Sequence, residues 1–197
     1  SISAGMSTSG NVMRLAAEEL GASDRIKVID SANLSTGIGL LVIEAAIMAK
    51  NNRTASQIVS EIEKLKPNVR ASFVVDTLTY LYRGGRCNAV AAMAGGVLKL
   101  HPRIVVENGA MNASKKYRGK INSVIMDYVK DMEKDLKKAR PERVFITHSG
   151  CEQETVEKVR AYLKELDIFD EILETRAGGV VSSHCGPGTL GVLYIAK

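Results

Sequence analysis

The stretch Asp76–Arg86, DTLTYLYRGGR, constrains the fold more than any other because it places a helix start close to a helix stop. Asp76 and Thr77 can cap the exposed N–H groups at the beginning of a helix. Gly84-Gly85 supplies the positive-φ residue that follows many helix ends. The apolar run Ser72–Val75 just before it reads as a buried strand. We therefore predict a strand and a one- to two-turn helix that aims Arg86 away from the body of the chain, at a joint between two lobes.

The residues before the joint predict an α/β lobe over residues 1–77. Ser35–Lys50 is apolar nearly all round, so we expect a buried helix there. Thr54 and Gln57 have the spacing of a capping box at the start of another helix. Alternating strands and helices favour a parallel sheet with right-handed crossovers. The remaining elements expected here are a helix over Gly10–Leu20, with Val12, Leu15, Ala16 and Leu20 on one face, and a strand at Arg25–Ile29.

The residues after the joint predict a second α/β lobe over residues 78–197. Asn108-Gly109 is the preferred pair for a type I′ turn and predicts a hairpin. The other expected elements are helices over Ala89–Leu100, over 121–136 and after the capping-box pair Ser149 and Glu152, a basic loop at Tyr117–Lys120, and strands at Arg143–Thr147, Asp170–Thr175 and Leu190–Ala196. The predicted fold class is therefore α/β, with a parallel-sheet βαβ lobe followed by a mixed-sheet α/β lobe with a hairpin.

Composition and charge argue against several classes of function. The chain is 45% hydrophobic and 25% charged, which is ordinary for a soluble globular protein. Its net charge of +5 comes from basic residues mixed with acidic ones, and Trp is absent, so we expect no nucleic-acid partner. No run approaches the roughly 18 apolar residues of a membrane span, so we expect no stable membrane insertion. The opening SISAGMS resembles the end of a strand and not a signal peptide, so we expect an N-terminal portion to be missing.

Cysteine and histidine usage indicates the redox environment and the metal content. Three cysteines without a CxxC pair favour a reducing, cytoplasmic location. Together with three scattered histidines they form a poor ligand set, so we predict no metal and no cofactor. Two of the histidines are expected to be structural: His148 in a loop and His101 in a turn.

Two stretches could bind an anion. The opening places Ser3, Ser7 and Ser9 near a helix N-terminus, where hydroxyls and N–H groups suit a negative charge. An ordinary Ser-rich cap explains this stretch equally well. His184 stands among small residues in Gly178–Gly188, GGVVSSHCGPG, which is an accessible setting for a ligand contact. From spacing alone, a structural role for His184 remains equally open.

Other residues allow an enzymatic alternative. Ser7 or Cys185 could act as a nucleophile with His184, as in a hydrolase or an acyl transferase. The chain lacks a G-x-S-x-G elbow, and adjacent residues such as His184 and Cys185 rarely point at one another. Arg86 at the joint and Arg118 in the basic loop offer positive charge to a ligand or a partner.

Several segments, taken in order, form one series: SISAGMS, VIDSANLSTGIGLLV, FVVDTLTYLYRGGRCN, LKLHPRIVVENGAM, KYRGK and SHCGPGTLGVLYI. This series resembles the DegV family of bacterial fatty-acid-binding proteins, and TL-x-YL-x-x-GGR with H-x-GPG is its most specific part. The resemblance implies two α/β lobes with a long-chain fatty acid, such as palmitate or stearate, between them. It also implies a non-catalytic binding subunit of a fatty acid kinase, which carries acyl-phosphate onward in phospholipid metabolism.

The resemblance also implies site residues. Ser7 matches the serine whose hydroxyl holds the carboxylate, and His184 matches the histidine that contacts it. Arg86 and Arg118 match arginines implicated in engaging the kinase. The chain departs from the family where Thr8-Ser9-Gly10 replaces Gly, Thr and an aromatic residue after the serine. It also contains neither the leading strand that ends in Asp-Ser nor the Thr-Ser-Gln-Pro-Ser segment that holds the carboxylate in the family.

A fatty-acid carrier is physically reasonable. Burying a sixteen-carbon chain at roughly 0.8 kcal/mol per CH₂ provides on the order of 12 kcal/mol of gross driving force. The small side chains of Ala89–Leu100, with Met93, suit a narrow lining, although they suit an ordinary core as well. The competing hypotheses are the Ser- or Cys-dependent enzyme and a plain interaction module.

Overall fold

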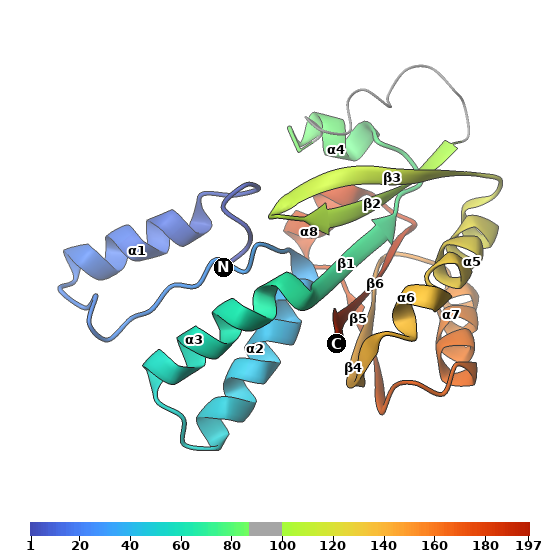
Figure 1. The fold of residues 1–197 in the computed structure, drawn as a ribbon. Coiled ribbons are helices and arrows are strands. Elements are labelled where there is room, and N and C mark those ends of the chain that lie inside the picture. The colour runs from blue at the N-terminus through green and yellow to red at the C-terminus, as the bar shows by residue number, and fades with distance from the viewer. Residues whose placement is uncertain (87–99) are drawn as a thin grey trace. The chain divides into compact units, whose positions relative to one another are not determined.

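The computed structural model describes residues 1–86 and 100–197 (Figure 1). Contacts between residues divide the chain into two compact units. The first unit is Ser1–Val69 with Glu107–Ala110, and the second is Arg70–Val106 with Met111–Lys197. The α/β class is confirmed, because a six-stranded sheet occurs together with helices along the chain. The two units are defined by contacts and do not test the predicted lobes, so the lobe boundary after residue 77 stays a prediction.

The first unit is mainly helical. Thr54 begins its third helix with the predicted capping box, which is confirmed: the Thr54 Oγ1 accepts a bond of 3.3 Å from the Gln57 N–H, and Gln57 Oε1 accepts one of 3.0 Å from the Thr54 N–H. Both ends of the box satisfy donors that an uncapped helix leaves open. The helices are α1 (Ser9–Glu19), α2 (Ser35–Lys50), α3 (Ala55–Leu65) and the short 3-10 helix η1 (Lys66–Asn68).

The strand predicted at Arg25–Ile29 is wrong, and with it the parallel βαβ sheet expected in residues 1–77, where β1 (Val69–Val74) is the one strand. The N–H groups of Arg25 and Ile26 bond to the Ala22 carbonyl in the turn after α1. The extended residues that follow meet the opening segment through only three backbone bonds: Ser1 N–H to Ile29 O, Ser31 N–H to Ser1 O, and Ser3 N–H to Asn33 O. This pairing runs in the parallel sense but is too short for a strand.

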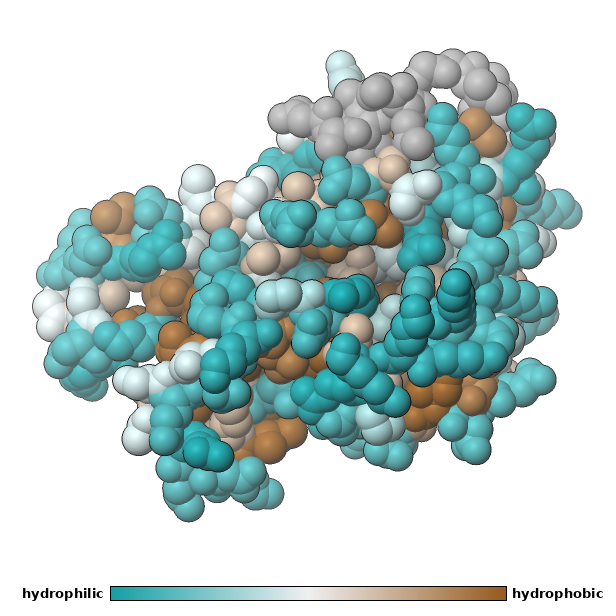
Figure 2. Space-filling model, viewed as in Figure 1, coloured by the Kyte–Doolittle hydropathy of each residue, from teal (hydrophilic) through white to brown (hydrophobic). Residues whose placement is uncertain are grey.

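Burial of the first two helices also differs from the sequence patterns. Gly10 and Ala17 are the buried residues of α1, whereas its apolar face is exposed, with Leu20 at 77%. The expectation that α2 is buried all round is wrong, because Val42 is 59% exposed and only Gly37, Leu40 and Leu41 of this helix are buried. Apolar side chains are visible at the surface of this part of the molecule in Figure 2.

The second unit contains a mixed sheet with the strand order β3-β2-β1-β6-β4-β5. β1 pairs with β2 and β4 with β6 in antiparallel fashion, whereas β4 and β5 are parallel. The predicted type I′ hairpin between β2 and β3 is confirmed, since Asn108 and Gly109 both have positive φ, at 52° and 77°. The strands are β1 (Val69–Val74), β2 (Leu100–Glu107), β3 (Ala110–Arg118), β4 (Ala139–Ser149), β5 (Glu171–Arg176) and β6 (Thr189–Ala196).

Helices α5, α6 and α7 lie along the same side of this sheet in Figure 1 and bury its main core. Tyr128 of α5 is fully buried and joins the helix to two strands. Its hydroxyl donates to the Ser72 carbonyl at 2.8 Å and accepts from the Val192 N–H at 3.0 Å. The helices of this unit are α4 (Thr79–Arg83), α5 (Ile121–Asp131), α6 (Glu133–Leu136), α7 (Gln153–Glu165) and α8 (Gly179–Cys185).

Several boundaries in the second unit differ from the predictions. The helix expected over 121–136 breaks at Met132, yet Met132 and Leu136 remain buried in register. The capping box predicted at Ser149 is wrong, because β4 runs through Ser149 and α7 begins after Glu152 without a side-chain cap. The basic loop is shorter than predicted, since β3 continues to Arg118. The helix predicted at 89–100 falls almost wholly outside the described residues.

None of the helices in residues 1–86 and 100–197 combines the length and the apolar character needed to cross a bilayer. Over the same residues, no group of three or more His, Cys, Asp or Glu side chains is placed to hold a metal ion.

Candidate functional site

The joint helix α4 forms as its start and stop signals predict. The Oγ1 atom of Thr77 accepts a hydrogen bond of 3.2 Å from the Thr79 N–H, which satisfies one open donor of the first turn. At the other end, Gly85 has a φ of +68°, and the Arg86 N–H donates to the Leu81 carbonyl at 3.0 Å. The stop signal is therefore confirmed, with the positive φ at the second glycine of the pair. The start signal is confirmed in part, because Thr77 bonds to the first residue of the helix but the N-cap residue is Leu78, which makes no side-chain cap.

Arg86 is exposed where the joint ends. Its guanidinium nitrogen Nη1 donates to the Gly84 carbonyl at 2.6 Å, so the side chain folds back over the end of α4. A role for Arg86 in contacting a partner stays a prediction.

His184 lies in the last turn of α8, a helix that the sequence patterns did not predict. Its Nδ1 atom is buried and has no hydrogen-bond partner among the described residues. A Cβ atom at Gly84 would lie 2.0 Å from this Nδ1 and 2.7 Å from Cε1 of the same ring. The imidazole therefore packs directly on the backbone of Gly84, and no other residue type fits there without moving the ring.

A second contact of the same kind lies beside the first. A Cβ atom at Gly186 would lie 2.3 Å from Cδ2 and 2.6 Å from Cε2 of Tyr80, so the phenol ring covers the Gly186 backbone. Gly186 also has a φ of +79°, which disfavours other residues. The motifs TL-x-YL-x-x-GGR and H-x-GPG therefore contact each other twice. The Tyr80 ring of the first packs on Gly186 of the second, and the His184 ring of the second packs on Gly84 of the first. The glycines were visible in the sequence, but nothing in the spacing paired them.

The cysteine beside His184 is a poor nucleophile. Cys185 is buried, and burial raises the pKa of its thiol to about 11. Burial likewise raises the pKa of Cys151 to about 11, and its thiol donates to the Thr189 carbonyl at 3.3 Å. Both thiols are therefore protonated near neutral pH, whereas nucleophilic cysteines react as thiolates. This argues against the enzymatic alternative that uses Cys185.

Ser7 precedes α1 and is partly buried. Its Oγ atom accepts a hydrogen bond of 3.2 Å from the Ser9 N–H and shares one of 2.7 Å with the Ser9 hydroxyl. The N-cap residue Thr8 makes no side-chain cap, so Ser7 supplies the hydroxyl at this helix start. Ser3 has a different role, because its buried hydroxyl donates to the Gly109 carbonyl at 2.6 Å. Of the three serines, Ser7 and Ser9 remain available to an anion.

Arg118 is exposed at the end of β3. Next to it, His101 corrects an expectation, since it is a buried residue of β2 and not a turn residue. The ring nitrogens of His101 lie 3.1 Å from the Asp76 carbonyl and 2.9 Å from the Gly119 carbonyl. His101 therefore ties the chain just after Arg118 to the first residue of the joint.

His148 is also a strand residue, contrary to the predicted loop. It is buried in β4, its Nδ1 accepts from the Cys151 N–H at 3.3 Å, and its Nε2 lies 3.4 Å from a carboxylate oxygen of Glu174. These contacts give His148 a structural role. Of the predicted site residues, the structure thus brings His184 against the joint that carries Arg86, and Ser7 belongs to the other unit.

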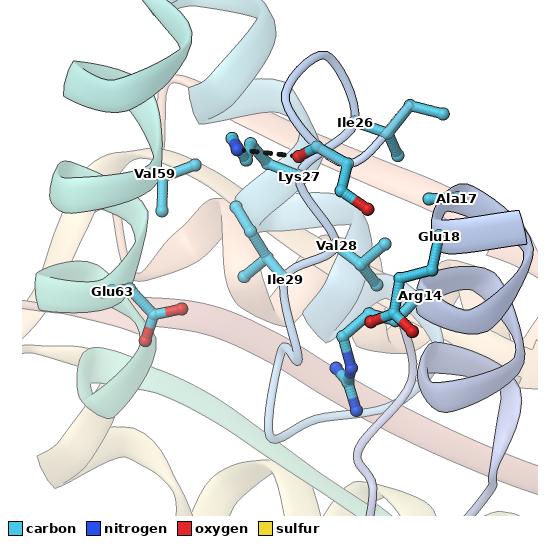
Figure 3. Close-up of a pocket in the computed structure, with 10 residues that line it drawn as sticks. Arg14, Ala17, Glu18, Ile26, Lys27, Val28, Ile29, Val59 and Glu63 are labelled. Carbon is cyan, nitrogen blue, oxygen red and sulfur yellow. Dashed lines mark hydrogen bonds between the residues drawn. The ribbon is translucent and has the colours of Figure 1, made fainter. Parts of the chain in front are cut away.

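A pocket of about 280 Å³ lies within the first unit and was not anticipated from the sequence. Figure 3 shows α1 and α3 on either side of the extended segment that carries Val28 and Ile29. The Nζ atom of Lys27 donates to the Ser23 carbonyl at 2.9 Å, so this cation is already engaged. The pocket is lined by Arg14, Ala17, Glu18, Ser23, Ile26, Lys27, Val28, Ile29, Val59 and Glu63.

A protein-family model described as "Uncharacterised protein, DegV family" matches residues 1–197. The chain belongs to the DegV family. A DegV domain-containing protein of Caldanaerobacter subterraneus subsp. tengcongensis is 33% identical over 183 residues, which cover 92% of this chain and 64% of that protein. The chain therefore spans less than two thirds of the length of this DegV relative.

Solved DegV structures share the fold. The structure of a DegV family protein from Thermus thermophilus, described by its fatty acid binding, matches all of this chain and 69% of its own, with 27% identity and a TM-score of 0.85. DegV of Bacillus subtilis, described as a fatty acid binding protein, matches the same shares with 28% identity and a TM-score of 0.81. The resemblance stated from the sequence motifs is thus confirmed at the level of family and fold.

Proposed function

We propose that this chain binds a long-chain fatty acid such as palmitate or stearate, with the carboxylate held by Ser7 and His184. The observation that carries the proposal is membership of a family in which two structures, 27% and 28% identical to this chain, are described by fatty acid binding. The chain is a carrier in this proposal and has no catalysis of its own.

The contacts of the two residues support their proposed role. A carboxylate taken out of water is costly unless it receives hydrogen bonds. His184 is partly buried with its Nδ1 packed on Gly84, which holds the ring in one position while leaving the other nitrogen to a ligand. Ser7 places a hydroxyl at the start of α1, where the helix dipole favours negative charge. Each is a donor suited to one oxygen of the head group.

Native mass spectrometry tests the proposal. The purified protein, stripped of lipid and then incubated with palmitate, should carry one palmitate per chain. His184→Ala and Ser7→Ala should each lower this occupancy, because each removes one donor to the carboxylate. Ser183→Ala is a matched control, since this neighbouring hydroxyl is exposed and donates to the Val180 carbonyl. Wild-type protein that retains no palmitate would refute the proposal.

The alternative enzyme is tested in the same samples. A Ser- or Cys-dependent hydrolase or acyl transferase would turn over a long-chain acyl ester, and His184→Ala would abolish that turnover. A carrier should release no acid from the ester at all. Because Cys185 is buried and its thiol is protonated near neutral pH, only Ser7 remains as a nucleophile for this alternative.

We further propose that a fatty acid kinase subunit reads the charged surface formed by Arg86 and Arg118 and phosphorylates the bound carboxylate. Both arginines are exposed, and guanidinium groups bind phosphate and carboxylate groups with paired hydrogen bonds. Arg118 is the last residue of β3, and His101 contacts the carbonyl of the next residue, Gly119, as well as that of Asp76 in the joint. Each arginine therefore belongs to a segment that this histidine contacts. Action in the cytoplasm also stays a proposal, and it rests on the cysteine content.

A further inference from the structure

The contact between His184 and Gly84 has a chemical consequence for the imidazole. The Nδ1 atom is buried and lacks a hydrogen-bond partner among the described residues. The other ring nitrogen, Nε2, is not in this situation. A proton on Nδ1 would be a buried N–H without an acceptor, which costs free energy. The proton of the neutral ring is therefore favoured on Nε2.

The contact between Tyr80 and Gly186 also restrains α8, the helix that carries His184. Gly186 follows His184 by two residues, at the end of α8, where the chain turns with a φ of +79°. The Tyr80 ring covers this turn, and the imidazole packs on Gly84, the residue that caps the end of α4 one turn after Tyr80. Two contacts between the same pair of helices leave α8 little freedom to rotate the histidine.

We propose that α4 and its cap residue Gly84 position His184. Gly84 and Tyr80 hold the ring with Nδ1 buried, so that Nε2–H is the donor that the imidazole offers to a ligand carboxylate. Gly84 and Tyr80 are positioning residues, since they act through His184. The inference rests on the proposed function for its ligand. It adds a tautomer, an orientation and two positioning residues to the histidine that the family resemblance supplied.

The first test concerns the ring itself and needs no lipid. In the ¹H–¹⁵N spectrum of the imidazole, recorded at alkaline pH, the wild-type protein should show Nε2 protonated and Nδ1 without a proton. Gly84→Ala places a Cβ 2.0 Å from Nδ1 and should change both His184 nitrogen signals. Gly179→Ala is a matched control in α8, because a Cβ there meets nothing within 4 Å, and it should leave them unchanged. A wild-type ring protonated on Nδ1 overturns the proposal.

The second test links position to binding. Gly84→Ala should lower palmitate retention at least tenfold in native mass spectrometry, whereas in a His184→Ala background it should cause no further loss. An equal loss in both backgrounds would mean that Gly84 acts through folding and would overturn the proposal. Unchanged nitrogen signals and unchanged retention in Gly84→Ala would overturn it as well. If the wild type binds no palmitate, the proposed function fails, and the spectra still decide the orientation.

Tyr80→Leu provides a second variant in case Gly84→Ala does not fold. Tyr80 is only partly buried, and its loss uncovers Gly186 without introducing a clash. The His184 nitrogen signals should broaden or split as the ring gains orientations, and palmitate retention should fall by a smaller factor than in Gly84→Ala. Sharp, unshifted His184 signals in Tyr80→Leu would remove Tyr80 from the positioning role.

Discussion

Removing the hydroxyl of Tyr128 should destabilise the second unit by about 2–4 kcal/mol. The hydroxyl is buried in the core between α5 and the sheet, where it donates to the Ser72 carbonyl at 2.8 Å and accepts from the Val192 N–H at 3.0 Å. Tyr128→Phe keeps the ring and deletes both of these bonds, together with the bond of 2.9 Å between the hydroxyls of Tyr128 and Ser72. It leaves a buried N–H unpaired, and an unsatisfied buried group costs about 1–3 kcal/mol beyond the bond itself.

The assay is equilibrium unfolding in urea, followed by circular dichroism, for Tyr128→Phe and the wild type. Tyr194→Phe is the matched control, because Tyr194 is buried in the same core and no hydrogen bond of its hydroxyl occurs within the described residues. Its unfolding free energy should change by less than about 0.5 kcal/mol, as for a substitution that touches no special feature. A Tyr128→Phe protein as stable as Tyr194→Phe would refute the reasoning that the hydroxyl holds helix to sheet.

Three further predictions concern a cap, two thiols and a surface arginine. Thr54→Ala should lower the unfolding free energy by about 1 kcal/mol in urea, because the capping box of α3 is lost. Peptide mapping after treatment with iodoacetamide should show Cys185 and Cys151 unmodified near neutral pH, because burial raises the pKa of each thiol from 9.0 to about 11. The same shift favours the folded state only while the thiols are protonated. The contribution of the two thiols to the free energy of unfolding should therefore be full below pH 9 and be lost as the pH rises through 11. Arg86→Ala should retain palmitate yet be phosphorylated more slowly by a fatty acid kinase; an emptied site would contradict this division of roles.

Local signals in the sequence were sufficient where one short stretch decides the structure. Asn108-Gly109 specified the hairpin because both residues accept positive φ, and Thr54 with Gln57 specified the cap of α3. The joint between Thr77 and Gly85 formed for the same reason. The apolar spacing of α5 also survived the break at Met132, since packing against the sheet preserved the register.

Tertiary contacts decided the features that sequence reasoning missed. His101 looked like a turn residue beside Pro102, but its two nitrogens face the carbonyls of Asp76 and Gly119, which are distant in sequence. Likewise α8 carries three glycines at its ends and has no apolar stripe, so its helical form depends on α4 packing against it. Gly84 and His184 are a hundred residues apart in the sequence, so no local pattern indicates that they contact each other.

The position of β3 at the edge of the sheet gives its basic residues a second role. An edge strand presents unpaired backbone groups that can recruit a strand from another molecule, and charged side chains hinder such recruitment. Lys115, Lys116 and Arg118 lie exposed along this edge. The arginine proposed to meet a kinase thus also helps to keep copies of the protein apart, and loss of Arg118 should be judged by aggregation as well as by phosphorylation.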